Sequence, residues 1–215
     1  DLGSGDGRIP LAAGKHFGAK ALGLEYNPQM VRLAQCYVRA EELGEKVEIR
    51  EADIFETDFS DATVLTLYLL SDLNLRLRPT ILKMKPGTRV VSNSFEMGDW
   101  PADQVIDTPK SYTRAYFWIV PAQVHGTWAF REEGGAHDFQ LQIEQEFQNI
   151  KATVPSGSAR ATVRDARLRG AEVEFTLSEQ GARALSFKGK VDQDTIRVST
   201  RRDGKSVSYV GRRAG

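Results

Sequence analysis

The nine residues DLGSGDGRI at the start of the sequence constrain the fold more than any other stretch. Gly3, Gly5 and Gly7 stand two apart, and glycines let a backbone take positive φ and approach a ligand closely. The residues from Arg8 onward predict a helix, whose free N–H groups attract polar and anionic groups. The spacing differs from the Gly-x-Gly-x-x-Gly of dinucleotide-binding loops. The pattern therefore predicts a ligand-binding turn that leads into a helix.

Residues 1 to about 110 alternate short apolar runs with helical patterns. We expect strands at 21–24, 47–50, 62–70 and from 90 onward, with helices at 28–44 and 71–85 between them. Asn27 and Pro28 suit a helix N-cap and first helical position, and Gly44 is expected to end that helix. Pro79 is expected to interrupt the next helix. Alternating strands and helices predict right-handed crossovers and a mostly parallel α/β sheet.

The chain changes character after about Tyr116, where the helical patterns stop. Short strands of alternating polarity follow, as at Phe139, Leu141 and Ile143, with glycine turns between them. This predicts an antiparallel β-barrel or β-sandwich. We therefore expect an α/β domain over residues 1–121 and a β domain of unknown role over 122–215. Its basic C-terminal end is read first as a solvated face, with a docking or oligomer surface as the alternative.

Three carboxylates support a specific ligand for the glycine turn. Asp1 precedes the first glycine by two positions, Glu25 ends the next strand, and Asp53 ends the strand after that. In open α/β sheets ligands bind at the carboxyl ends of strands, so we expect these three side chains at one edge. A carboxylate at Glu25 can accept hydrogen bonds from both hydroxyls of a ribose. Asp53, beside Ile54 and Phe55, suits the amino group and flat ring of adenine.

This constellation resembles the class I S-adenosylmethionine-dependent methyltransferases over roughly residues 1–120. The resemblance implies a Rossmann-like domain in which the glycine turn lies against the methionine part of the cofactor. It also implies that Glu25 binds the ribose and that Asp53, with Ile54, binds the adenine. The full set of expected cofactor-binding residues is Asp1, Gly3, Ser4, Gly5, Gly7, Glu25, Tyr26, Asp53 and Ile54.

A narrower resemblance concerns the methyl acceptor. The segments DLGSGDGRI, LEYNP, EADIF and SFEMGDW look like those of bacterial relatives of the small protein-lysine methyltransferases that modify mitochondrial carrier and ATP synthase subunits. The segment after the fourth strand departs from that pattern, and the β region is not part of it. The same segment lacks the Asn/Asp-Pro-Pro-Tyr/Phe of enzymes that methylate amino groups of nucleic acids. The resemblance therefore implies a protein lysine as acceptor and does not favour nucleic acid.

The candidate catalytic residues are Tyr68, Asp72 and Trp100. A lysine substrate needs a narrow pocket with an aromatic wall and an acceptor, which these side chains could supply. Each also has a structural alternative: a buried strand position for Tyr68, a helix N-terminal charge for Asp72, and packing over a loop for Trp100. Methyl transfer itself needs positioning and an unprotonated amine rather than a nucleophile–base triad.

Other functions remain open at this stage. The acceptor could be a small molecule or lipid, or the chain could be a non-catalytic cofactor-binding module whose β domain makes the biological contact. Formal net charge is zero, so charge indicates neither nucleic acid nor membrane. The histidines show no metal-ligand spacing, Cys36 is expected on the apolar face of its helix, and no apolar run is long enough to span a membrane.

The position of the glycine turn carries a last expectation. In the fold implied by the resemblance this turn follows a central strand, yet no strand precedes Asp1. We therefore expect the natural protein to carry an upstream helix and an apolar strand, without which the cofactor should bind poorly. A cytoplasmic location is favoured.

Overall fold

A computed structural model describes residues 1–107, 113–155 and 161–214. The chain divides into two compact units, Asp1–Ile119 and Val120–Gly215. The domains predicted from the sequence were residues 1–121 and 122–215. The change from helical to alternating sequence patterns coincides with this division. No helix in the described ranges has the length and apolarity needed to cross a membrane.

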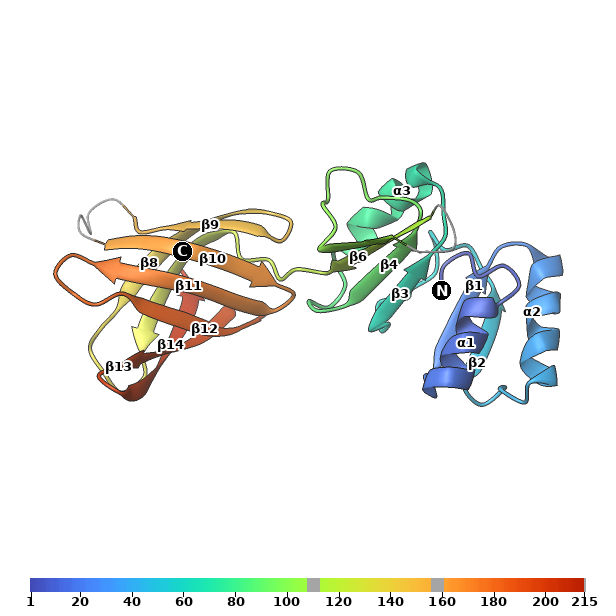
Figure 1. The fold of residues 1–215 in the computed structure, drawn as a ribbon, viewed down its shortest axis with the longest axis horizontal. Coiled ribbons are helices and arrows are strands. Elements are labelled where there is room, and N and C mark those ends of the chain that lie inside the picture. The colour runs from blue at the N-terminus through green and yellow to red at the C-terminus, as the bar shows by residue number, and fades with distance from the viewer. Residues whose placement is uncertain (108–112, 156–160, 215) are drawn as a thin grey trace. The chain divides into compact units, whose positions relative to one another are not determined.

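The first unit combines helices with short strands (Figure 1). Its elements are α1 (Arg8–Phe17), β1 (Ala21–Glu25), α2 (Pro28–Ala40), β2 (Val47–Glu51), β3 (Val64–Leu67), α3 (Ser71–Ile81), β4 (Arg89–Asn93), β5 (Gln104–Asp107) and β6 (Arg114–Ile119). α1 and α2 pack on β1 and β2 around a buried cluster of Val31, Ala34, Val38, Val47 and Ile49.

The start of α2 matches the sequence prediction, because Asn27 is the N-cap and its side chain accepts a hydrogen bond from the Gln29 N–H at 2.9 Å. Its end does not. The helix stops at Ala40 rather than at Gly44, since Glu42 takes a positive φ of 54°. Cys36 is exposed, so its expected place on the apolar face is wrong. Val31, Ala34 and Val38 instead form the buried side of the helix.

α3 also differs from its prediction. Pro79 lies inside the helix, which continues to Ile81 without interruption and ends four residues before the expected limit. Pro79 stands in the last turn. A ring this close to the C-terminus removes one hydrogen bond without breaking a long segment. The strand expected at 62–70 is shorter and is confined to β3.

The strands of the first unit pair in two sets. β1 and β2 are parallel, and a four-stranded set has the order β3-β4-β6-β5, in which β3 and β4 are parallel and the other pairs antiparallel. Leu2 forms parallel bridges to both Leu24 on β1 and Leu67 on β3. Its N–H donates to the Thr66 carbonyl at 3.0 Å, and the Gly3 N–H donates to the Leu24 carbonyl at 2.8 Å. The first residues therefore link the carboxyl ends of β1 and β3.

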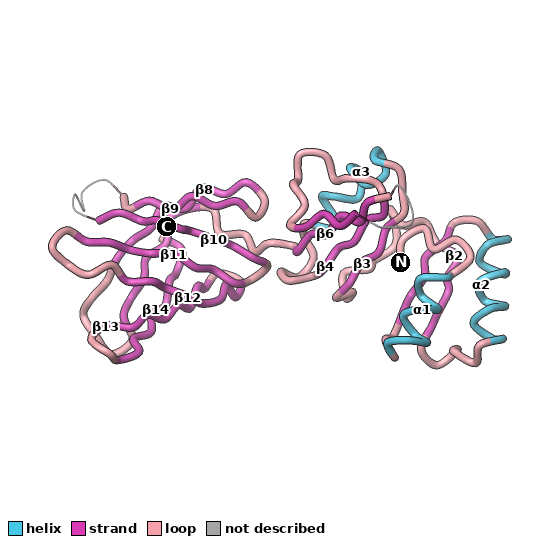
Figure 2. The backbone as a smooth tube through the Cα atoms, in the orientation of Figure 1, coloured by secondary structure: helices cyan, strands magenta, loops and turns pink. Residues whose placement is uncertain are grey.

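The described part of the second unit contains strands and loops (Figure 2). Its strands are β7 (Gly126–Glu132), β8 (Phe139–Glu146), β9 (Asn149–Thr153), β10 (Ala161–Arg169), β11 (Glu172–Glu179), β12 (Leu185–Asp192), β13 (Thr195–Arg202) and β14 (Lys205–Arg213). They form one antiparallel sheet in which the first strand, β7, pairs with the last, β14. β9 and β10 lie against each other without a described ladder. The sheet is a nearly closed barrel, which confirms the predicted antiparallel β architecture.

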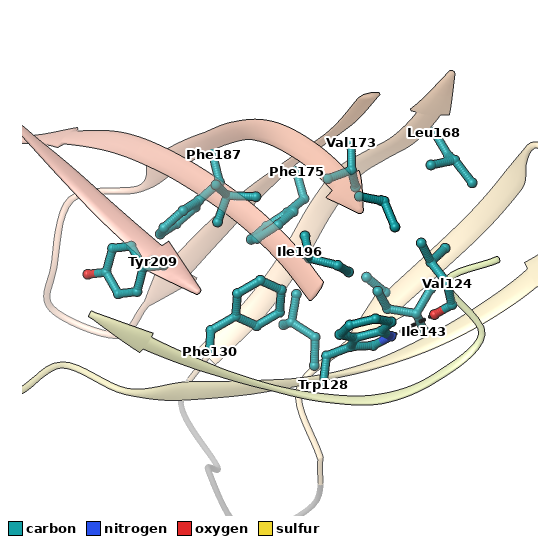
Figure 3. Packing of buried hydrophobic residues seen from close by; sticks show 14 of the residues in the cluster. Val124, Trp128, Phe130, Ile143, Leu168, Val173, Phe175, Phe187, Ile196 and Tyr209 are labelled. Carbon is teal, nitrogen blue, oxygen red and sulfur yellow. Dashed lines mark hydrogen bonds between the residues drawn. The ribbon is translucent and has the colours of Figure 1, made fainter. Parts of the chain in front are cut away.

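Aromatic side chains pack in the interior of this barrel (Figure 3). Phe130 stacks on Phe139 with ring centroids 4.8 Å apart, and Phe175 stacks on Phe187 at 4.9 Å. Offset ring pairs of this kind add stability beyond the apolar area that they bury.

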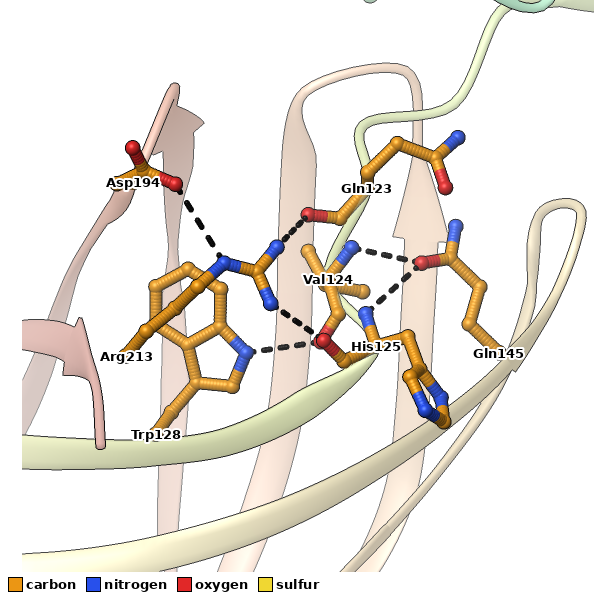
Figure 4. A network of polar contacts seen from close by, with 7 residues as sticks. All are labelled: Gln123, Val124, His125, Trp128, Gln145, Asp194 and Arg213. Atoms are coloured by element: carbon orange, nitrogen blue, oxygen red, sulfur yellow. Dashed lines mark hydrogen bonds and ion pairs between the residues drawn. The ribbon is translucent and has the colours of Figure 1, made fainter. Parts of the chain in front are cut away.

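Trp128 is fully buried near one end of the barrel. Its Nε1–H donates to the Val124 carbonyl at 2.8 Å, and the Arg213 guanidinium lies 4.6 Å from its ring centre. Arg213 also donates to the carbonyls of Gln123 and His125 (Figure 4). These hydrogen bonds connect β14, the last strand of the barrel, to the segment that precedes β7, its first strand.

Candidate functional site

The glycine turn has a backbone geometry that residues with side chains rarely adopt. Gly3, Gly5 and Gly7 all have positive φ, at 73°, 53° and 77°. A Cβ at Gly3 would lie 2.8 Å from the Leu69 side chain, and one at Gly7 would lie 2.9 Å from the Ala34 Cβ. Side chains at either position would meet both conformational strain and a clash. The turn therefore lies tightly between α2 and the segment after β3.

Glu25 is brought directly to this turn. One carboxylate oxygen accepts a hydrogen bond from the Gly5 N–H at 2.8 Å, and the other accepts one from the Asn27 N–H at 2.9 Å. Each oxygen retains a further acceptor site. The carboxylate is fixed in position and can accept two more hydrogen bonds, which is what a ribose with two hydroxyls would supply.

Asp53 lies on the loop that follows β2. This strand ends at Glu51, so Asp53 follows the strand rather than ending it, and the Ala52 N–H donates to the Glu25 carbonyl at 2.9 Å. One Asp53 carboxylate oxygen accepts a hydrogen bond from the Phe55 N–H at 2.8 Å. Asp53 and Ile54 are both half-buried. The backbone bond at Ala52 places this loop next to the end of β1, one residue before Asp53.

The other predicted cofactor residues have different surroundings. The Asp1 carboxylate accepts a hydrogen bond from the Thr66 hydroxyl at 2.7 Å, a partner that the sequence did not suggest. Ser4 is buried against Gly23 of β1, and its hydroxyl has no partner in the described chain. Tyr26 is 76% exposed. The structure thus gathers Asp1, Gly3, Gly5 and Glu25 about one turn and leaves Tyr26 open to solvent.

The segment after β3 carries two of the three catalytic candidates. Tyr68 is 60% exposed, which excludes its alternative as a buried strand residue, and its ring lies 6.2 Å from that of Phe95. Leu69, the next residue, is the one that contacts Gly3. Asp72 is exposed in the first turn of α3. Tyr68 and Asp72 therefore lie along the segment that borders the glycine turn, and Phe95, from the segment after β4, places its ring beside that of Tyr68.

Trp100 is placed differently from the other two candidates. It is 1% exposed, its ring lies 5.9 Å from that of Trp118, and its carbonyl accepts a hydrogen bond from the Trp118 Nε1–H at 3.0 Å. The ring is enclosed in the interior of the first unit. The structure does not bring Trp100 to the surface that carries Tyr68 and Asp72.

Two polar residues of α3 were missed by the sequence reasoning. Asn74, fully buried, donates to the carbonyls of Phe95 and Glu96 at 3.3 and 3.4 Å. Arg78, one turn later, donates to the Met97 carbonyl at 2.8 Å and pairs with Asp99, whose pKa this hydrogen bond lowers. Their four-residue spacing on one helix face was the available signal. Together they hold the segment that presents Phe95 to Tyr68.

Comparison with known proteins identifies the first unit. Residues 1–104 match the family model of the ANTKMT methyltransferase domain. A protein-lysine N-methyltransferase of Saccharolobus islandicus is 43% identical over 108 residues, which cover 49% of this chain and 67% of that protein. The chain belongs to this methyltransferase family. It is accordingly an S-adenosylmethionine-dependent methyltransferase, and the resemblance inferred from the sequence is confirmed.

Two further similar proteins show how much of this chain is shared with known methyltransferases. The mouse adenine nucleotide translocase lysine N-methyltransferase is 30% identical over 128 residues, 59% of this chain and 53% of that protein. A solved structure of an RNA methyltransferase from Salinibacter ruber, in complex with S-adenosyl-L-homocysteine, is 42% identical in sequence to this chain. The match covers 58% of this chain and 80% of that chain, with a TM-score of 0.55. The chain spans about half the length of the mammalian relatives that it matches.

The turn fits S-adenosylmethionine by the chemistry of its donor set. The fixed carboxylate of Glu25 offers acceptors to the ribose hydroxyls. At the start of α1 the Asp6 carboxylate accepts a hydrogen bond from the Arg8 N–H at 3.3 Å, and Pro10 has no N–H to donate. The fit to the cofactor therefore rests on Glu25 and on the glycines of the turn rather than on this helix start. The lack of side chains at Gly3 and Gly5 leaves the backbone accessible.

Proposed function

We propose that this chain transfers a methyl group from S-adenosylmethionine to the amino group of a protein lysine. The observation that carries this proposal is the Glu25 carboxylate held by the Gly5 N–H, with Tyr68 on the segment that contacts the same turn through Leu69 and its ring paired with Phe95. A fixed cofactor acceptor and an aromatic acceptor wall are the two elements that lysine methylation requires.

The cofactor roles follow the strand ends. Glu25 binds the ribose, the turn from Asp1 to Gly7 receives the methionine part, and Asp53 with Ile54 receives the adenine. Tyr26, next to Glu25 and exposed, covers the adenosine. Ser4 supports the turn from beneath, where its side chain packs on Gly23. The Thr66–Asp1 hydrogen bond fixes the turn to β3.

The acceptor roles lie after β3. Tyr68 and Phe95 form an apolar wall for the lysine side chain, and Asp72 attracts the lysine cation toward it. S-adenosylmethionine, when bound, supplies the electrophilic sulfonium methyl group. The lysine ammonium would lose one proton to solvent before its nitrogen accepts the methyl group, and the methylated ammonium product would keep the positive charge. Trp100 supports this wall from the interior rather than contacting the lysine.

The finer architecture belongs to this proposal as well. We assign residues 1–121 to a Rossmann-like methyltransferase domain, in which Leu2 marks the end of the central strand between β1 and β3. The parallel bridges of Leu2 to both strands support this assignment. We assign a separate binding role to the β barrel, which corresponds to the β domain expected over residues 122–215.

A second acceptor is favoured by one observation. The Salinibacter ruber protein, 42% identical to this chain, is named an RNA methyltransferase. RNA is therefore the rival acceptor, against the expectation from the missing Asn/Asp-Pro-Pro-Tyr/Phe motif.

Labelling with tritiated S-adenosylmethionine tests the acceptor. The chain is incubated with a cell lysate, with the same lysate treated with RNase and with the same lysate treated with protease. We expect protease-sensitive, RNase-resistant label, and methyl-lysine on acid hydrolysis. Label that RNase removes would replace the lysine proposal by RNA. Tyr68→Ala should lower labelling at least tenfold, with Tyr37→Ala, an exposed tyrosine of α2, as the matched control.

A further inference from the structure

The β barrel has a pocket at one end that the methyltransferase proposal does not use. A cavity of about 670 Å³ lies at this end and is bordered by aromatic rings of the barrel core. Its lining includes Phe139, Leu177, Phe187, Thr200, Arg202 and Tyr209. Cavities of this size hold drug-sized ligands, and an eight-stranded barrel is just wide enough to enclose one small ligand.

Inward-facing positions become polar toward this end. On β13 the buried side chains run from Ile196 and Val198 to Thr200, and Arg202 follows in the same alternation. On β7 the inward series that starts with Trp128 and Phe130 ends in Glu132. Arg202 pairs with Glu132 and donates to the Tyr209 hydroxyl at 3.2 Å. A purely structural core would continue with apolar residues, because burying polar groups costs stability.

Two hydroxyl groups in the pocket retain hydrogen-bonding capacity. Thr200 is 5% exposed, and its hydroxyl has no partner in the described chain. The Tyr209 hydroxyl accepts from Arg202 and keeps its own proton to donate. Burial raises the pKa of Tyr209, which keeps that proton in place. In Figure 3 the Tyr209 hydroxyl points away from the other labelled rings. A buried hydroxyl without a partner costs free energy unless a ligand satisfies it.

The uncharged polar groups of the lining indicate the head group of the ligand. The lining carries charges of both signs, from Asp138, Glu179, Asp203, Arg183, Arg201 and Arg202. Arg202 pairs with Glu132, which lies outside the lining. The two groups that retain hydrogen-bonding capacity, the Thr200 and Tyr209 hydroxyls, are both uncharged and suit an uncharged head group.

We propose that this end of the barrel binds an uncharged amphipathic small molecule. Its apolar body packs on Phe139, Phe187 and Leu177, and its carbonyl or hydroxyl head accepts from Tyr209 and bonds with Thr200. This binding site is independent of the methyl-transfer site and does not rest on the proposed function.

Isothermal titration of the full chain with 1-decanoylglycerol, below its micelle-forming concentration, tests the site. Glycerol and decanoate serve as comparison ligands, and S-adenosylmethionine is left out. We expect saturable binding of decanoylglycerol, weaker binding of decanoate and none of glycerol. Absence of binding to the folded chain would overturn the proposal. Tighter binding of decanoate would overturn the assignment of an uncharged head.

Matched variants locate the binding. Thr200→Val should weaken decanoylglycerol binding about fivefold to tenfold, the usual effect of one lost hydrogen bond. Thr200→Ser should retain binding because it keeps the hydroxyl. Thr195→Val, on the same strand outside the lining, is the control and should bind as the unmodified chain does. Equal affinity in all three variants would place the ligand elsewhere and contradict the proposal.

Discussion

The two units are held together by different kinds of contact. In the first unit a backbone N–H group and the Glu25 carboxylate meet at a turn whose glycines have positive φ. In the second, side chains converge from strands all around the barrel and interlock as stacked aromatic rings. The contacts of the turn are hydrogen bonds to backbone and carboxylate groups, whereas the barrel core is held by packing between side chains.

This difference sets what each unit should tolerate. Changes in the barrel core should cost folding free energy and leave cofactor binding intact. Changes in the glycine turn should affect both the fold of the first unit and its ligand.

The largest effect is expected from Trp128→Ala. Removal of this fully buried ring leaves a cavity and removes its hydrogen bond to Val124 and its contact with Arg213. We expect a loss of about 3–5 kcal/mol in the unfolding free energy of the barrel, measured by urea denaturation. Phe17→Ala, at a side chain that is 83% exposed, should change stability by less than about 0.5 kcal/mol. Loss of S-adenosylmethionine binding in Trp128→Ala would break the distinction between the units.

Gly7→Ala should produce the next largest effect. The new Cβ would combine a φ of 77° with a contact of 2.9 Å to the Ala34 Cβ. We expect a loss of about 2–4 kcal/mol from strain and overpacking, read from thermal unfolding by circular dichroism. Gly18→Ala has a similar φ of 64° but open space around it, so it should cost only about 1 kcal/mol. Equal costs for the two variants would show that the contact with α2 does not matter.

A smaller effect is expected at the N-cap of α2. Asn27→Ala removes the side-chain acceptor of the Gln29 N–H and should cost about 1 kcal/mol. Gln29→Ala, at an exposed position two residues after the cap, keeps the backbone N–H that the cap accepts and should be close to neutral. Chemical denaturation of the full chain measures both. A neutral Asn27→Ala would mean that water satisfies that N–H equally well.

The sequence was sufficient where the signal was local. The N-cap pair at Asn27 and Pro28, the helix after the glycine turn and the antiparallel character of the second unit could all be predicted. Helix ends were less accurate because competing backbone choices decide them. Glu42 takes a left-handed conformation before Gly44 is reached, and Pro79 is tolerated in the last turn of α3.

The sequence was insufficient where contacts join distant residues. Nothing near Thr66 indicates that it donates to Asp1, and nothing near Arg202 indicates its pairing with Glu132. Trp100 shows the same limit, because an aromatic residue beside a loop gives no sign of whether it is exposed or packed on Trp118. Such contacts depend on how the elements meet, which the pattern along the chain does not encode.

Within the first unit, the proposed acceptor wall of Tyr68 and Phe95 can be separated from the cofactor site by a substitution at Arg78. Arg78→Met removes the donor to the Met97 carbonyl and the ion pair with Asp99. We expect lysine labelling to fall about threefold to tenfold while affinity for S-adenosylmethionine changes less than twofold, because only the segment that presents Phe95 loosens. An equal loss of affinity and labelling would show that this segment also belongs to the cofactor site. Arg32→Met, an exposed arginine of α2, is the control.

The most direct test of the central assignment is titration of S-adenosylmethionine into the chain and its Glu25→Gln variant. The carboxylate is held by the Gly5 and Asn27 N–H groups and is assigned to the ribose. We expect Glu25→Gln to weaken binding about fivefold to 150-fold, as the loss of charge-assisted hydrogen bonds would do. Glu48→Gln, at an exposed carboxylate of β2, should leave the affinity within twofold. An unchanged affinity in Glu25→Gln would contradict the assignment of the glycine turn and Glu25 as the cofactor site.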